Sequence, residues 1–177
     1  MKKTEIPAIT NLHHLLEYEI RHFSGTENQL RGPIHKWIST ASSINLKTVL
    51  RQYLTTVEEH LSQLEAYSLA EQMLSVTVSS RVMKAMIQDT DDKIKECHDK
   101  EVSDACLLAS IQQINHIKIS LYGTAAAFAN ELGNEKAASL FHLFEINEKK
   151  IDQQLNRLAK KEINPRALAT VVLTRSL

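Results

Sequence analysis

Residues 115–128 read NHIKISLYGTAAAF, and their apolar side chains recur every three or four positions, which is the spacing of one face of an α-helix. The pattern continues on both sides, from Leu107 to Leu132. Lys118 falls at the centre of this face, where a bundle helix normally carries only hydrophobic side chains. The segment therefore predicts a long core helix with one cation on its inward face.

Three other segments show the same spacing, at residues 12–30, 46–64 and 137–158. Gly32-Pro33 predicts an end or a kink after the first, with IHKWISTASS continuing as a second segment. Residues 69–100 predict a crossover, with a short Ser-capped helix at SSRVMKAMI and a loop or short exposed helix at QDTDDKIKECHDKE. The expected helix caps and stops are Thr10, Asn45, Ser103 or Asp104, Gly133 and Pro165.

Two helical hairpins joined by a crossover predict an all-α fold, an antiparallel four-helix bundle of the ferritin type. The 177 residues fit a single domain. We expect the core bundle over about residues 10–162 and a short C-terminal extension over residues 163–177.

The composition, the hydropathy and the local motifs argue against several classes of protein. The 21 Lys and Arg balance the 21 Asp and Glu, which argues against a nucleic-acid-binding protein. No apolar stretch is long enough to span a membrane, and the N-terminus lacks the apolar part of a signal peptide, so we expect a cytoplasmic protein. Cys97 and Cys106 lack CxxC spacing and are expected to be free thiols. No phosphate loop, nucleophile elbow or zinc motif is present.

Charged residues also interrupt two of the other three helical patterns. Glu19 and Glu27 lie on the first, and Glu148 and Asp152 lie on the fourth. Inward carboxylates on several helices of one bundle form di-metal sites that bind iron or manganese. Such sites also use Glu-x-x-His on two helices, which is missing here. The alternative is that these charges lie at the rim of each apolar face and reach water.

Four segments in order resemble the YciE/YciF-type ferritin-like proteins of bacteria, a family of unknown function associated with stress. They are EIRHFSGTENQLRGPIHKW, LKTVLRQYLTTVEEHLSQLE, DACLLASIQQINHIKISLYGT and NEKKIDQQLNRLA, and together they cover about residues 12–159. The third is the most specific. The resemblance implies a ferritin-like bundle and a homodimer.

The resemblance also implies which metal ligands remain. The positions that match are Glu19, Glu27, His116, Glu148 and Asp152. Where the family has His, acid, Glu, Glu and Glu, this chain has Tyr53, Thr56, Asn115, Lys118 and Asn147. Lys118 thus replaces a carboxylate that binds metal in the family. We expect it to pair with Glu148, Glu19 or both in a buried charge cluster, because an unpaired buried charge is very costly.

Three functions remain open. The first is a non-enzymatic, stress-associated ferritin-like protein that has lost its di-metal site and needs no cofactor. The second is a di-iron or di-manganese protein, a ferroxidase or peroxide scavenger, that uses the remaining acids with His60 or His116. The third is a helical adaptor that binds a protein partner through an apolar tail containing Val171, Val172 and Leu173.

Overall fold

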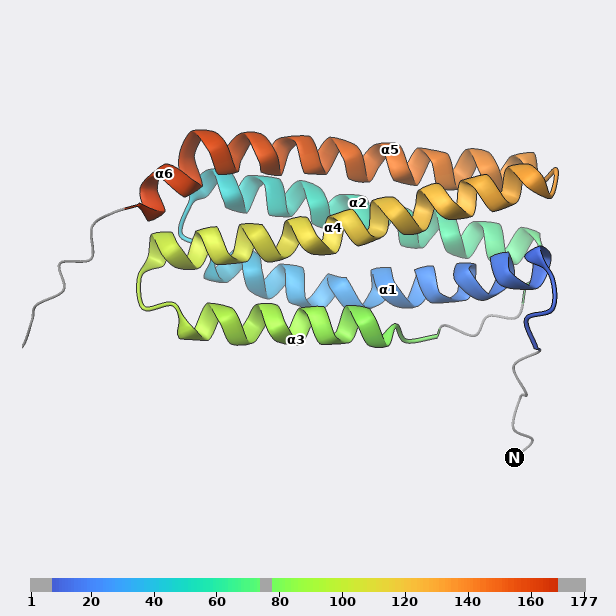
Figure 1. Cartoon of the computed structure of the whole chain (residues 1–177), viewed down its shortest axis with the longest axis horizontal. Coiled ribbons are helices and arrows are strands. Elements are labelled where there is room, and N and C mark those ends of the chain that lie inside the picture. The colour runs from blue at the N-terminus through green and yellow to red at the C-terminus, as the bar shows by residue number, and fades with distance from the viewer. Residues whose placement is uncertain (1–7, 74–77, 169–177) are drawn as a thin grey trace, which may run out of the picture.

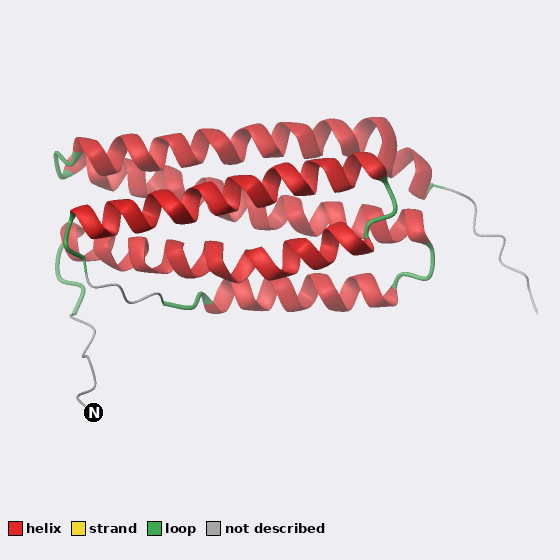
Figure 2. Cartoon of the chain, turned by 180° about the vertical axis from the view of Figure 1, so that it is seen from behind, coloured by secondary structure: helices red, strands yellow, loops and turns green. Residues whose placement is uncertain are grey.

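The computed structural model describes residues 8–73 and 78–168, and every regular element in these two ranges is a helix (Figures 1 and 2). The long helices are α1 (Leu12–Thr40), α2 (Ile44–Ala70), α4 (Lys100–Glu131) and α5 (Glu135–Leu158). A shorter helix, α3 (Arg81–Glu96), precedes α4, and a π-helical turn (Ala159–Ile163) leads from α5 into α6 (Asn164–Ala167).

The four long helices form the predicted bundle. α1 packs against α2 and α4 packs against α5, and these two hairpins contact each other through α2 with α5 and α1 with α4. α2 and α4 run in the same direction, because α3 carries the chain back along the length of the bundle (Figure 1). This long crossover between two hairpins is the ferritin-type connection that the sequence predicts.

The crossover is more helical than expected. Gln88–Glu96, expected as a loop or short exposed helix, forms the second half of α3. Its charges stabilise the exposed face through the pairs Asp89–Lys93 at 2.6 Å and Asp92–Lys95 at 2.9 Å. On the inner side, Trp37 of α1 is fully buried and donates its indole N–H to Asp91 at 2.8 Å. This bond ties α3 to the bundle.

Several predicted helix ends differ from the structure. α1 continues through Pro33 as one helix instead of ending there. Its N-cap is Asn11, and the caps of α2 and α4 are Ser43 and Asp99.

Two predicted stops have different outcomes. Gly133 does end α4, with a φ of 67° that favours glycine. Pro165 lies inside the first turn of α6 rather than ending a helix.

The core consists of two apolar clusters. One contains Leu30, Trp37, Leu50, Ile111 and Leu155, and the other contains Phe23, Leu64, Ala129 and Phe141 with their neighbours. Ile163 is 2% exposed and belongs to the first cluster, so the bundle extends slightly into the expected tail. Val171, Val172 and Leu173 lie outside the described residues.

Candidate functional site: a buried polar centre

Buried polar side chains lie between the two apolar clusters, near the middle of the bundle. They are Glu27 of α1, His60 of α2, Asn115 and Lys118 of α4, and Glu148 of α5, and each is 0% exposed. We call these five residues the polar centre. Each of the four long helices contributes at least one of them, so the centre exists only once the bundle has assembled.

Lys118 lies between the two carboxylates of the centre. Its Nζ is 2.6 Å from Oε1 of Glu148 and 2.9 Å from Oε2 of Glu27. The ammonium also lies 4.7 Å from the centre of the Tyr53 ring, within the range of a cation–π contact. Burial alone would lower the pKa of Lys118, but Glu148 and Glu27 raise it above its ordinary value. Lys118 is therefore a permanently charged cation at physiological pH.

The remaining carboxylate oxygens also have donors. Asn115 donates its amide to Oε2 of Glu148 at 2.6 Å, and the hydroxyl of Tyr122 donates to Oε1 of Glu27. His60 Nδ1 lies 3.2 Å from Glu27 Oε1 and 3.5 Å from Glu148 Oε1. Because an ionised carboxylate only accepts hydrogen bonds, the imidazole donates through Nδ1.

The two carboxylates differ in their pKa. Burial raises both, but the charge of Lys118 and the hydrogen bonds from His60 and Tyr122 outweigh burial at Glu27 and hold its pKa below the ordinary value. At Glu148 burial, together with repulsion from Glu27, outweighs Lys118 and raises the pKa. Both carboxylates pair with Lys118, but Glu27 accepts hydrogen bonds from His60 and Tyr122, whereas Glu148 accepts one from Asn115.

Three of these side chains have the chemistry of metal ligands. One ligand atom each from Glu27, His60 and Glu148 lies within 4.8 Å of the other two. Two features do not fit the di-metal centre that ferritin-like folds use. A di-metal site draws on four carboxylates and two histidines, whereas Asn115 and Tyr53 are neutral at this level of the bundle. The ammonium of Lys118 also already contacts both carboxylates.

The other residues that sequence predicted lie outside the polar centre. Glu19, expected in the cluster with Lys118, is about half-buried beside His22. It precedes Glu27 by eight residues, which is about 12 Å along a helix, so it cannot reach the level of Lys118. Glu27 takes the place expected for Glu19.

His116 and Asp152 pair with each other instead. His116 Nε2 lies 3.0 Å from Asp152 Oδ1, and the histidine side chain is 62% exposed. His116 neighbours Asn115, which points inward, and successive helical residues differ by about 100° around the axis. These two family-matched residues therefore lie at the surface between α4 and α5.

Sequence reasoning missed the role of Tyr122 and underrated His60. Asn115, Lys118 and Tyr122 follow i, i+3, i+7 spacing, which places them on one helical face. This spacing was the available signal for Tyr122. His60 stacks on Phe144, with ring centroids 3.9 Å apart, a contact between α2 and α5 that no local pattern reveals.

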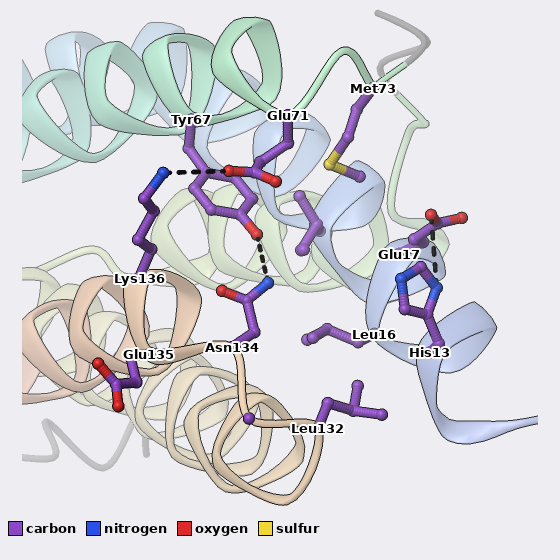
Figure 3. Close-up of a pocket in the computed structure, with 12 residues that line it drawn as sticks. His13, Leu16, Glu17, Tyr67, Glu71, Met73, Leu132, Asn134, Glu135 and Lys136 are labelled. Carbon is purple, nitrogen blue, oxygen red and sulfur yellow. Dashed lines mark hydrogen bonds and ion pairs between the residues drawn. The ribbon is translucent and has the colours of Figure 1, made fainter.

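A separate cavity of about 680 Å³ lies at one end of the bundle, where α1 begins, α2 ends and the α4–α5 turn passes (Figure 3). Its polar groups are largely paired with one another. Asn134 donates to the Tyr67 hydroxyl at 3.1 Å, and Lys136 lies 3.8 Å from Glu71. None of the polar centre lines it.

Comparisons with known proteins agree with this architecture. Protein YciF of Escherichia coli (strain K12) is 29% identical over 142 residues, which are 80% of this chain and 86% of that protein. The crystal structure of the E. coli stress protein YciF superposes with a TM-score of 0.81 at 25% identity, over 88% of this chain and 99% of that one.

A second solved structure shares the fold. YcfI, described as a putative structural protein from Rhodopseudomonas palustris, has a TM-score of 0.81 at 24% identity, and the match covers 88% of this chain and 98% of that one. The family described as domain of unknown function (DUF892) matches residues 11–168. The chain therefore belongs to this YciF-type family.

Proposed function

We propose that this chain is a non-enzymatic, ferritin-like protein in which Lys118 takes the place of the metal. The observation that carries the proposal is the position of its ammonium, 2.6 Å from Glu148 and 2.9 Å from Glu27. A divalent cation in the same place would bind the same two carboxylates. The lysine supplies one positive charge there without any ion.

Physical chemistry favours the lysine over a metal ion in this site. The pKa of Lys118 is raised by its two partners, so the ammonium does not lose its proton to admit a metal. Bringing a divalent ion next to a buried ammonium is strongly unfavourable at low dielectric. Metal binding would therefore require the side chain to leave a site in which it is fully buried.

Metal content of the untagged protein tests the proposal. The protein is loaded with excess ferrous iron or Mn²⁺, desalted and analysed for elements. We expect near-zero metal in the wild type. About two metals per chain, the complement of a di-metal carboxylate site, would overturn the proposal.

A pair of variants at position 118 makes the test sharper. Lys118→Glu restores the acid that the family resemblance implies at this position, and Lys118→Gln has a similar size without charge. We expect Mn²⁺ to raise the melting temperature of Lys118→Glu but not of Lys118→Gln or the wild type, since a ligand that binds only the folded state stabilises it. Equal shifts in all three would show that position 118 does not control metal binding.

One observation favours a second candidate, an oxidative metal protein that uses iron or manganese. The trio Glu27, His60 and Glu148 has two carboxylates and one imidazole, a ligand set suited to iron. This candidate predicts that the wild type binds metal in the same experiment and consumes oxygen or peroxide with ferrous iron. Lack of both would exclude it.

The physiological setting is proposed from the relatives and from one exposed side chain. The E. coli relative is described as a stress protein, so we propose a stress-associated role here. We also propose a homodimer, because Leu168, at the start of the apolar tail, is 82% exposed. Light scattering would then give twice the 20.0 kDa chain mass, and truncation after Pro165 would lower it to a single chain.

A further inference from the structure

The cavity at the end of the bundle is large enough to hold a small molecule (Figure 3). Its volume of about 680 Å³ lies within the range of about 300–1,000 Å³ that is usual for ligand sites. Its apolar lining comes from α1, from the chain after α2 and from the end of α4, and consists of Leu16, Ile20, Met73 and Leu132. This lining would remove the hydrocarbon part of a bound molecule from water, which favours binding.

One wall of the cavity is held in place by the turn between α4 and α5. Asn134, the N-cap of α5, accepts the backbone N–H of Ala137 at 3.0 Å and donates to the hydroxyl of Tyr67 at 3.1 Å. The Tyr67 ring also packs edge-on against Phe141, with ring centroids 6.3 Å apart. The tyrosine therefore has a fixed position before any ligand arrives, which lowers the ordering cost of binding. An aromatic ring in such a wall favours a cationic ligand.

The charged groups of the lining are mostly acidic. They are three carboxylates and one ammonium, on Glu17, Glu71, Glu135 and Lys136. Arg21 adds a positive charge nearby, 3.7 Å from Glu17, but the balance stays negative while His13 is neutral. Burial raises the pKa of the Tyr67 hydroxyl, and the charges of Glu71 and Glu17 raise it further. Both carboxylates thus place negative potential at the tyrosine that lines the cavity.

The ion pairs at the cavity are too long to be hydrogen bonds. Lys136 Nζ lies 3.8 Å from Glu71 Oε1, and the other pair, His13 Nδ1 with Glu17 Oε1, is 3.6 Å long. An N–H···O hydrogen bond spans at most about 3.2 Å, so Glu17 and Glu71 keep oxygen atoms that can accept from a ligand. A bare metal ion fits less well, since among the described residues three possible ligand atoms lie within 4.8 Å of one another only at the polar centre.

We propose that this cavity binds a small organic cation, an alkylammonium group on an apolar body. The ammonium would donate hydrogen bonds to Glu17 and Glu71 beside the Tyr67 ring, and the apolar body would cover Leu16 and Leu132. An anion would be repelled by the excess of carboxylates, and a neutral molecule would gain nothing from their charge. The proposal does not depend on the function proposed above, because no residue of the polar centre lines the cavity.

The test uses the full chain at about pH 8, where an ordinary histidine side chain is neutral, with hexylammonium as the probe. Hexanol and hexanoate are its neutral and anionic counterparts of similar length. Isothermal titration calorimetry measures each affinity, and NMR of the ¹⁵N-labelled protein locates the site. We expect hexylammonium to bind about tenfold or more tighter than hexanoate, with the largest shifts at Gly133 and Asn134, which line the cavity. An affinity for hexanol or hexanoate that equals that for hexylammonium, no binding of hexylammonium, or shifts centred elsewhere would overturn the proposal.

Two neutral variants test the role of the carboxylates. Glu17→Gln and Glu71→Gln should each weaken hexylammonium binding by about threefold to fivefold, the effect of one exposed ion pair, and leave the binding of hexanol unchanged. Glu59→Gln makes the same change in net charge and is the control, because Glu59 is exposed and lies about 18 Å before Glu71 along α2. Equal effects of all three substitutions, or no effect of any, would mean that the cavity carboxylates do not bind the cation.

Discussion

At the scale of single residues, the polar centre depends on charge compensation. One ammonium faces two carboxylates, all three are fully buried, and the desolvation of such groups is offset only when each has partners. His60, Asn115 and Tyr122 supply neutral or shared donors for the remaining oxygens. The removal of Lys118 therefore leaves both carboxylates without their shared cation, and the removal of either carboxylate leaves the lysine with one anionic partner instead of two.

Lys118→Ala should destabilise the protein by about 3–5 kcal/mol, because it leaves two buried carboxylates facing each other. Urea unfolding at neutral pH, followed by circular dichroism, measures the loss. Lys136→Ala is the matched control, since that side chain is 82% exposed and its loss should change stability by less than about 0.5 kcal/mol. A Lys118→Ala effect as small as the control would mean that the ion pairs contribute nothing.

Glu27 should make stability depend on acid pH. Its folded-state pKa lies below the ordinary value, so the unfolded chain binds the proton more readily, and the stability it contributes is lost as pH falls. Between about pH 5 and pH 3 the wild type should lose more stability than Glu27→Gln, which has no proton to bind. The pKa of Glu148 is raised in the folded state, so its contribution to stability increases as pH falls. Parallel pH profiles for the wild type and Glu27→Gln would show that Glu27 is not the carboxylate whose charge is stabilised by the fold.

At the scale of elements, sequence predicted the number and order of the long helices but not their first residues. Asp104 was an expected cap for its own helix, yet its carboxylate accepts the backbone N–H groups of Ser42 and Ser43 at 2.8 and 2.7 Å. It therefore stabilises the start of α2, which is distant in sequence. Several polar residues near each helix start satisfy the local rule for a cap, and tertiary contacts choose among them.

Gly25 marks a contact between elements that hydrophobic spacing cannot show. It lies buried on α1, where an added Cβ would overlap the carbonyl oxygen of Val78 in the segment before α3. The backbone N–H of Val78 donates to the carbonyl of Arg21 at 3.3 Å, so this segment lies directly against α1. The close approach requires a residue without a side chain.

Gly25→Ala should lower the free energy of unfolding by about 1–3 kcal/mol, because the segment at Val78 must move. This reverses the usual effect of the substitution, since alanine favours a helix by about 1 kcal/mol over glycine. Gly32→Ala in the same helix meets no atom within 4 Å and should leave stability unchanged or higher, the gain being limited by the following proline. Thermal melts of both variants show whether packing against Val78 or helix propensity dominates at position 25. Similar changes in melting temperature for Gly25→Ala and Gly32→Ala would contradict the close contact at Gly25.

At the scale of the whole molecule, the polar centre divides the hydrophobic core into two clusters. The sequence indicated that Lys118 and Glu148 lie on inward faces, because each sits on the spacing of its own helix. It could not indicate that Glu27 rather than Glu19 is level with them, because both lie on the α1 face and the choice depends on how the helices align along the bundle axis. The alignment of the helices along the bundle axis also decides that His60 and Tyr122 lie at the level of the polar centre.

If the polar centre acts as one unit, removing all of its charge should be far less harmful than removing part of it. The triple variant Glu27→Gln, Lys118→Met and Glu148→Gln keeps similar volumes, and its amides can still pair with Tyr122 and Asn115. Replacing a buried ion cluster by neutral groups is often neutral or stabilising, so we expect the triple variant to melt near the wild type and well above Lys118→Met alone. The comparison needs all single variants, because coupling appears as a departure from additivity. Losses that simply add up would mean that the three charges act separately, and that the four helices do not depend on a shared centre for their alignment.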